Sequence, residues 1–562
     1  MSTIQRTLLW TTLLLLALIS PTAHSLTFVE NVNGYTLNQQ GKLITFTNIA
    51  FEEEFIIGMN LSQEPGGIVT KIDGRGRVML PGLIDAHGHI LGLGQNLLEI
   101  DLRGSLSEVE AVKRVVEFVS AHTSPDKTSK TENTQWLIGG GWNQVLWPTK
   151  AFPTKGSLDA ALKDRPVVLS RVDGHAIWVN SAALKLAGVD ANTPSPSGGE
   201  IVKDENGQPT GLLIDNAVYL VTQLIPKADV EQLSAQLNAA SEHLLSLGIT
   251  SVHDAGISKK GYDFYKQQAQ AGKLKFRIYA MLAATDPQIN EMLAAGHIKT
   301  ANDMLSIRSV KAYGDGALGS RGAALIEPYS DDKDNHGLLV TPQENLPSLF
   351  SQVLGANFQL NFHAIGDRAN RLALQQFAKT FKTFPENTER HRIEHAQVVS
   401  VEDIHLFREL GIIPSMQPTH ATSDMNMAED RIGKARLKGA YAWRTFLDQG
   451  SRIAFGSDFP VELANVFHGL HAAITRQSGE NEPKMGWIPE EKVSVEEALR
   501  GFTLDAAYAA FQDDKLGTLE VGKRADFIFI DRDIFTGPAS DIRDTQVLET
   551  WINGQQVFSK SR

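Results

Sequence analysis

Six side chains that can bind a metal ion or move protons stand beside short apolar runs of this sequence. In chain order they are His87, His89, Lys311, His363, His395 and Asp458. Side chains alternate along a strand with period two, so the first His-x-His pair would point both imidazoles to one side. Imidazole and carboxylate ligands together favour Zn²⁺ over Ca²⁺ or Mg²⁺, which prefer oxygen ligands.

Lys311 is the unusual member of this set, because a protonated ammonium repels a metal ion and cannot bind it. If burial lowers its pKa, the free amine could react with CO2, and the carbamate would bridge two metal ions. In the alternative interpretation Lys311 binds substrate or pairs with Asp315. We therefore expect one or two zinc ions per chain, and the carbamate interpretation favours two.

Eight apolar runs, separated by helical patterns, read as the strands of a barrel. They cover residues 83–85, 249–254, 276–282, 309–314, 359–363, 392–395, 412–417 and 452–458. Strands that alternate with helices pair in parallel, and eight such units predict a closed (β/α)8 TIM barrel. Reactive side chains in such barrels gather at the carboxyl ends of the strands, which is where the six residues fall.

The flanking segments have a different pattern. Residues 26–80 and 515–562 contain short alternating runs separated by turn residues, which predicts one small β-sandwich domain built from both termini. The barrel domain is then expected at 81–514. The first two barrel strands are too far apart for a simple loop, so an inserted subdomain is expected at about 104–225. The strand-like run at 166–172 is assigned to this insertion, since it would otherwise be a ninth barrel strand.

The first 25 residues predict an export signal. Arg6 precedes an uncharged apolar run at 8–19, Pro21 ends that run, and Ala23 and Ser25 supply small residues at a cleavage site. The run is shorter than the roughly 20 residues of a membrane span. We expect a periplasmic or secreted chain with no stable membrane span after cleavage, and the alternative is an uncleaved anchor.

Composition limits the other partners. The chain has no cysteine, which excludes disulfides, thiolate metal sites and lipid attachment through cysteine. A net charge of −12 argues against nucleic-acid binding, which needs a basic surface. The expected partner is a small-molecule substrate, and a homodimer is an open alternative.

Several longer motifs resemble those of the amidohydrolase superfamily. Residues 81–89 resemble its opening signature, and residues 517–526 resemble the closing signature at which the chain re-enters the small β-domain. Further motifs resemble the YtcJ-like branch, which includes N-substituted formamide deformylase. These are residues 141–142, 172–175, 178–181, 248–256 and 310–322. The resemblance covers nearly all of the chain after residue 25.

The resemblance implies a metal role for all six residues. The first histidine pair and Asp458 would bind the more buried ion, the two later histidines would bind a second ion, and carboxylated Lys311 would bridge them. A metal-activated water would attack an amide-type, non-peptide C–N bond of a small molecule. Asp458 would accept the proton of that water and pass it to the leaving amine. The alternatives are an esterase, lactonase or isomerase with the same centre, or an exported binding protein without turnover.

Five further residues are candidates for substrate contact. They are Trp142, His175, Arg321, Gln417 and His420. Two of them fall in the predicted insertion, which could reach over the pocket, although aromatic residues more often pack an insertion onto its barrel. Arg321 could bind a substrate carboxylate through a bidentate pair or pin its loop to Asp315.

Glu394 directly precedes His395, so strand alternation should turn it away from the metal side. We therefore expect Glu394 to be a structural partner. His468 and His471 stand at i and i+3 on a predicted helix and are expected to be packing residues.

Overall fold

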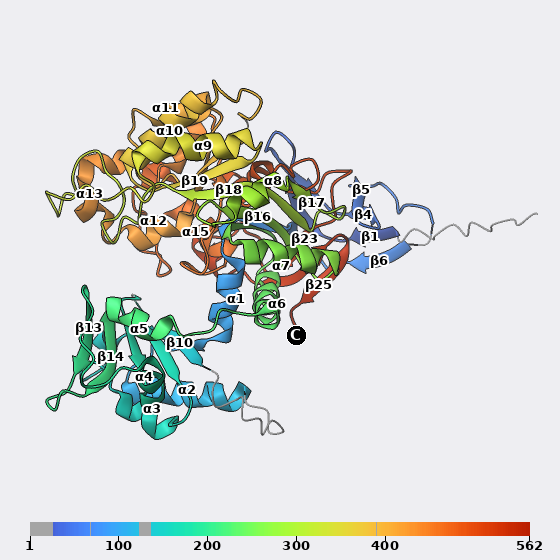
Figure 1. The fold of residues 1–562 in the computed structure, drawn as a ribbon. Helices are drawn as coiled ribbons and strands as arrows, with labels where there is room; N and C mark the ends of the chain where they lie inside the picture. The colour runs from blue at the N-terminus through green and yellow to red at the C-terminus, as the bar shows by residue number, and fades with distance from the viewer. Residues whose placement is uncertain (1–25, 68, 123–135, 173, 389, 562) are drawn as a thin grey trace, which may run out of the picture.

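The computed structural model describes residues 26–67, 69–122, 136–172, 174–388 and 390–561. The predicted export signal lies outside these residues. Figure 1 shows a barrel with a small sheet domain on one side and a separate α/β unit below it. Within the described ranges, none of the helices has the length and apolar character that crossing a membrane requires.

Eight parallel strands form the barrel, which confirms the fold predicted from the sequence. In spatial order they are β8 (Leu83–Gly88), β15 (Ile249–Ile257), β16 (Arg277–Ala283), β18 (Leu305–Tyr313), β19 (Gln359–Ala364), β20 (Arg392–His395), β21 (Ile413–Met416) and β22 (Ala454–Phe455). The short strand β17 (Ile298–Lys299) pairs with β18 at the side. A parallel bridge between Gly88 and Phe459 brings the end of the last strand beside the first.

The helices pack against the barrel because their apolar residues recur on one face. Helix α6 (Val230–Ser246) begins with a capping box of Asp229 and Gln232, and it buries Leu233, Leu237 and Leu244 at helical spacing. The helices between barrel strands β15 and β22 are α7 (Lys259–Gln270), α8 (Ile289–Ala294), α9 (Leu346–Gly355), α10 (Asp367–Thr380), α11 (Ile404–Glu409), α12 (Pro418–Asp424), α13 (Ala428–Arg436) and α14 (Trp443–Asp448). After the last strand come α15 (Val466–Thr475), α16 (Val495–Gly501) and α17 (Leu504–Ala509).

Both chain ends build two further sheets. The first contains β5 (Phe55–Met59), β4 (Ile49–Glu52), β1 (Leu26–Glu30) and β6 (Val69–Asp73). The second contains β25 (Gln555–Ser559), β24 (Val547–Ile552), β23 (Phe527–Ile530), β7 (Val78–Pro81), β2 (Asn33–Leu37) and β3 (Leu43–Phe46). Val29, Phe46, Met79 and Phe527 share one apolar core, so residues from both termini fold together. At the barrel's amino-terminal end, Arg277 Nε donates to Asp526 Oδ2 over 2.7 Å and ties the barrel to this domain.

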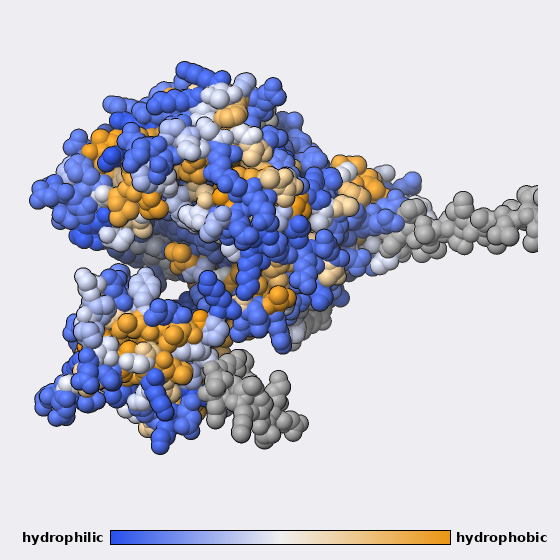
Figure 2. Space-filling view, in the orientation of Figure 1, coloured by the Kyte–Doolittle hydropathy of each residue, from blue (hydrophilic) through white to orange (hydrophobic). Residues whose placement is uncertain are grey.

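The inserted unit has a sheet and a core of its own. Its sheet contains β13 (Gly199–Lys203), β14 (Pro209–Asp215), β12 (Ala176–Val179), β11 (Val167–Arg171), β10 (Leu137–Trp142) and β9 (Ile100–Asp101). Its helices are α2 (Glu108–His122), α3 (Lys155–Ala161), α4 (Ser181–Ala187) and α5 (Tyr219–Thr222). The run at 166–172 thus forms a strand of the insertion rather than of the barrel. Helix α1 (Ile90–Leu98) leads from the barrel to this unit, and Figure 2 shows a cleft between the two bodies.

Candidate metal centre

A cavity of about 400 Å³ opens at the carboxyl ends of the barrel strands. All six residues of the predicted set line it. The rest of its wall is formed by polar and apolar side chains, among them Tyr313, Leu318, Ile365, Gln397, His420, Asp424, Val461 and Glu462. The structure therefore brings together residues that are far apart in the sequence, at the end of the barrel where reactive groups gather.

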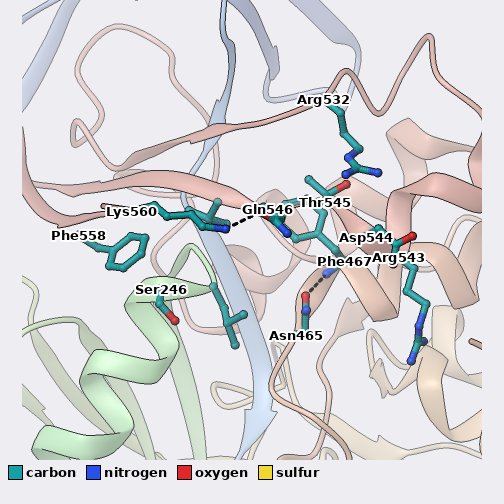
Figure 3. Close-up of a pocket in the computed structure, with 12 residues that line it drawn as sticks. Ser246, Asn465, Phe467, Arg532, Arg543, Asp544, Thr545, Gln546, Phe558 and Lys560 are labelled. Carbon is teal, nitrogen blue, oxygen red and sulfur yellow. Dashed lines mark hydrogen bonds between the residues drawn. The ribbon is translucent and has the colours of Figure 1, made fainter. Parts of the chain in front are cut away.

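A larger hollow of about 570 Å³ lies elsewhere, between the end of α6, the start of α15 and the C-terminal strands (Figure 3). Its polar lining includes Arg532, Arg543 and Lys560, and no histidine lines it. This hollow therefore lacks the imidazole donors that a zinc site needs.

The tightest group of donors consists of His87, His395 and Asp458. One ligand atom from each lies within 4.8 Å of the others, and all three residues are buried. Asp458 Oδ1 lies 3.6 Å from His87 Nε2 and 3.2 Å from His89 Nε2. Two ligands that bind one tetrahedral zinc ion at about 2.0 Å stand roughly 3.3 Å apart. The donor set fits a zinc ion in both its chemistry and its spacing.

Lys311 lies among the imidazoles. Its Nζ is 3.1 Å from His87 Nε2, and the side chain is buried. Burial lowers the pKa of Lys311, because removal from water disfavours the charged ammonium. The alternative pairing with Asp315 is wrong. Asp315 instead accepts three backbone N–H groups at 2.8–2.9 Å, and no ion pair joins it to Lys311 within the described chain.

The two later histidines lie edge to face, with ring centroids 4.5 Å apart. His395 Nδ1 contacts Gln417 Oε1 at 2.8 Å, and since an amide oxygen can only accept, the ring proton stands on Nδ1. His395 therefore keeps Nε2 free to bind a metal ion. His363 Nε2 is buried, lacks a hydrogen-bond partner in the described chain and lies 3.6 Å from Asp315 Oδ1.

The protonation states suit metal binding. Burial lowers the pKa of His87 to about 4 and that of His363 to about 3, and it holds the pKa of His395 well below its usual value. In each case the low-dielectric surroundings disfavour the imidazolium. These histidines are therefore neutral at physiological pH, which is the form that ligates metals.

Asp85 holds the first and last strands in register. It accepts hydrogen bonds from Ser457 N at 3.0 Å, Ser457 Oγ at 2.6 Å and His87 N at 3.1 Å. Asp458 N in turn donates to His87 O at 2.7 Å. Burial raises the pKa of Asp85 to about 6, although these donors oppose the rise. The network explains how His87 and Asp458 meet.

Two of the candidate ligands have unusual backbone conformations. His395 has φ of 75° and Asp458 has φ of 61°, in the left-handed region that non-glycine residues rarely adopt. Because His395 leaves the regular pleat, both it and the preceding Glu394 point into the barrel. The prediction that Glu394 turns away from the metal side is wrong, since Glu394 Oε2 contacts His87 Nδ1.

Among the predicted substrate residues, His420 lines the cavity. Its Nε2 lies 3.6 Å from Asp458 Oδ2, and its ring stacks over His395 at 5.9 Å. Gln417 lies behind His395 and bonds to that ring, as described above. Arg321 Nη2 donates to Asp331 Oδ2 at 2.9 Å, in a loop beyond the cavity wall.

The two candidates from the insertion also lie away from the cavity wall. Trp142 is fully buried in the core of the inserted unit, and its Nε1 donates to Leu169 O at 2.7 Å. His175 has 73% of its side chain exposed and contacts Asp215 Oδ1 at 2.9 Å. The packing of Trp142 follows the ordinary preference of large aromatic side chains for an apolar core.

Tyr313 and Gln397 are among the residues of the cavity wall that sequence reasoning did not single out. Tyr313 follows Lys311 by two residues on β18, so strand alternation places both on the same face. That spacing could have identified Tyr313. Gln397 lies beyond the irregular backbone of His395 and Ala396, so alternation gives no signal for it.

Comparison with known proteins identifies the family of the chain. The sequence profile of the amidohydrolase family matches residues 70–558. The amidohydrolase YtcJ of Bacillus subtilis is 34% identical over 492 residues, which cover 86% of this chain and 90% of that protein. The N-substituted formamide deformylase of Arthrobacter pascens is 26% identical over 504 residues, which cover 87% of this chain and 90% of that enzyme.

A solved structure shares the fold over most of the chain. The metal-dependent hydrolase of Pyrococcus furiosus superposes with a TM-score of 0.73 at 28% sequence identity, covering 91% of this chain and all of that one. The family profile spans the barrel and reaches into both terminal sheets. The chain therefore belongs to the amidohydrolase family of metal-dependent hydrolases.

Proposed function

We propose that this protein is a zinc-dependent hydrolase that cleaves an amide-type, non-peptide C–N bond of a small molecule. The observation that carries the proposal is the convergence of all six candidate ligands on one cavity at the carboxyl end of the barrel. The similarity to an N-substituted formamide deformylase supports the type of bond. A cavity of about 400 Å³ has the size of a small-molecule site.

The resemblance to the amidohydrolase superfamily assigns the donors to two ions. The pair from β8 and Asp458 would hold one zinc ion, and His363 with His395 would hold a second. Lys311 would bridge the two ions once its neutral amine has reacted with CO2. A bound zinc ion supplies a Lewis acid for the scissile carbonyl and lowers the pKa of a water ligand towards neutrality.

Asp458 is proposed to move the proton. Burial alone would raise its pKa, but the neighbouring histidines, His87 first, hold that pKa well below the usual value. The carboxylate is therefore ionised and can accept a proton from the attacking water, then pass it to the leaving amine. Its Oδ1 lies towards the first histidine pair and its Oδ2 towards His420, so both oxygens face groups of the site.

Export is proposed from the apolar run at residues 8–19 and the small residues that follow it. Amino-terminal sequencing of the protein recovered outside the cytoplasm tests this proposal, and a chain that still begins at Met1 would contradict cleavage.

The substrate is proposed to be a small molecule rather than a nucleic acid. Light scattering of the purified protein would show whether it is a monomer or a homodimer.

Metal analysis and a substrate panel test the proposed function together. Protein purified without chelator should contain near two zinc ions per chain and should release amine from N-formyl, N-acyl or cyclic amides. Matched esters and lactones in the same assay separate the amide preference from the alternative chemistry. Absence of zinc, with no turnover gained on its addition, would contradict the proposal and favour a binding protein.

A further inference from the structure

A buried network lies directly behind His87, on the side away from Lys311. Glu394 Oε2 contacts His87 Nδ1, and Arg392 Nε donates to Glu394 Oε1 over 2.7 Å. Arg392 Nη1 then contacts His253 Nδ1 at 2.9 Å. All four residues are buried and come from three different barrel strands. The network thus connects a candidate metal ligand to the interior of the barrel.

The contact with Glu394 fixes the tautomer of His87. A carboxylate can only accept a hydrogen bond, so the ring proton of His87 stands on Nδ1 and Nε2 carries the lone pair that can bind a metal ion. Nε2 is the nitrogen that lies 3.1 Å from Lys311 Nζ and 3.6 Å from Asp458 Oδ1. Glu394 therefore turns the metal-binding nitrogen of His87 towards the other candidate ligands.

Arg392 fixes both Glu394 and the backbone beside His87. Its Nη2 donates to Ala86 O at 2.8 Å, while Nε and Nη1 bond to Glu394 and His253. A guanidinium can only donate, so His253 accepts through Nδ1 and is held in the opposite tautomer to His87. Each nitrogen of the Arg392 guanidinium thus has a hydrogen-bond partner, and these bonds fix the positions of the protons in the network.

Stability alone is a poor explanation for this ion pair. Burying both charges carries a large desolvation cost, and well-packed apolar side chains at such positions are often neutral or stabilising. The pair does, however, end on a candidate metal ligand. Carboxylates that accept the second ring proton of a ligating histidine orient the ring and increase its basicity.

We propose that Glu394 is a positioning residue of the metal centre, locked by Arg392, and that it sets the zinc affinity contributed by His87. This inference rests on the proposed zinc site. Removal of such a partner weakens metal binding about 10- to 100-fold in characterised sites.

Zinc affinity measured by competition with a chromophoric chelator tests the proposal. Glu394→Gln keeps the size of the side chain but removes the charge, and it should raise the zinc Kd about 10- to 100-fold. Cobalt-substituted protein should show a changed visible spectrum, because the orientation of one imidazole ligand changes. Glu394→Asp retains the carboxylate and should recover part of the lost affinity.

A variant that lacks both charges distinguishes weakened zinc binding from misfolding. Glu394→Gln leaves Arg392 buried without its counter-ion, which is costly. The double variant Arg392→Met/Glu394→Leu removes both charges and should fold, with the same weakened zinc binding. The matched control is Arg277→Met/Asp526→Leu, which removes a buried ion pair of 2.7 Å at the opposite end of the barrel. The control should leave the zinc Kd unchanged.

Three outcomes overturn specific claims. A folded Arg392→Met/Glu394→Leu variant with the wild-type zinc Kd and cobalt spectrum overturns the positioning role. An equal loss of affinity in the Arg277→Met/Asp526→Leu control also overturns it, since any buried ion pair would then have the same effect. Wild-type protein that binds no zinc overturns the proposed metal centre itself, so the two failures are distinguishable.

Discussion

The two ends of the barrel use buried imidazoles in different ways. At the amino-terminal end, His391 Nδ1 accepts from Leu360 N at 2.9 Å and His391 Nε2 contacts Asn387 O at 3.0 Å. At the carboxyl end, the Nε2 atoms of His363 and His420 have no hydrogen-bond partner in the part of the chain that the structure describes. An imidazole whose two nitrogens bond only to backbone atoms supports the fold, whereas a nitrogen that faces other metal-binding donors in a cavity is suited to binding.

The same contrast separates two buried lysines. Lys311 lies 3.1 Å from His87 Nε2 at the carboxyl end, while Lys523 Nζ donates to Leu516 O at 3.0 Å where the chain re-enters the terminal sheets. Burial lowers the pKa of both. Burial therefore does not by itself mark a functional lysine, and the neighbouring imidazoles make the difference.

The largest effect is expected at the carboxyl end, from Asp458→Asn. The amide cannot accept the proton of the attacking water, so kcat should fall about 10²- to 10⁴-fold. Circular dichroism and metal analysis should show a folded protein that still contains zinc. Near-full activity of this variant on any substrate that the wild type cleaves would contradict the assignment of Asp458.

The lysine pair gives the next test. Lys311→Ala should lower the zinc content from two ions towards one, because the bridging carbamate can no longer form. Lys523→Met removes a buried lysine from the other region and should leave the zinc content unchanged. Metal analysis of both variants measures the difference. Two ions in Lys311→Ala would remove the carbamate interpretation and leave Lys311 a role in substrate binding.

Much of this division between the ends was predictable from the sequence. The barrel strands show as apolar runs, and the ligands show as polar residues where those runs end, so both signals are local. His87 and His89 share a side of the chain because of period-two alternation, which the pattern reveals directly.

The positioning contacts were not predictable in this way. The bond between Glu394 and His87 joins residues 307 positions apart, across strands that are not neighbours. The positive φ of His395 also breaks the alternation on which the prediction for Glu394 depended. Trp142 lay in a motif that suggested function, but its place was decided by the apolar core of the insertion. Contacts of this kind follow from tertiary packing rather than from sequence spacing.

At the amino-terminal end of the barrel, we expect His391 to make the free energy of unfolding depend on pH. Burial lowers the pKa of His391 to about 4, against 6.5 in an unfolded chain. The unfolded chain therefore takes up the proton first, and the stabilisation present above pH 6.5 is lost as pH falls towards 4. About 2 kcal/mol of unfolding free energy should be lost between pH 7.5 and 5 through this residue. Urea unfolding of wild type and His391→Gln measures it, and identical pH dependence in the two proteins would contradict the assignment.

The smallest effect concerns the outer part of the carboxyl end, where the charge of the cavity should select substrates. Asp424 and Glu462 line it, and Lys311 is the only lysine or arginine among the lining residues. Arg321 and Arg431, which do not line the cavity, both pair with Asp331. Ser423 Oγ donates to Glu462 Oε1 at 2.5 Å and orients that carboxylate.

An amide with a distal ammonium should therefore be cleaved with a higher kcat/KM than a matched amide with a distal carboxylate. Glu462→Gln should lower the ratio of these two kcat/KM values several-fold, since a partly exposed charge pair is worth about 1 kcal/mol or less. Glu409→Gln, on α11 away from the cavity wall, is the matched control and should leave the ratio unchanged. If Glu462→Gln also leaves the ratio unchanged, the carboxylate of Glu462 does not select the substrate, and the contrast between the two ends is confined to the metal ligands.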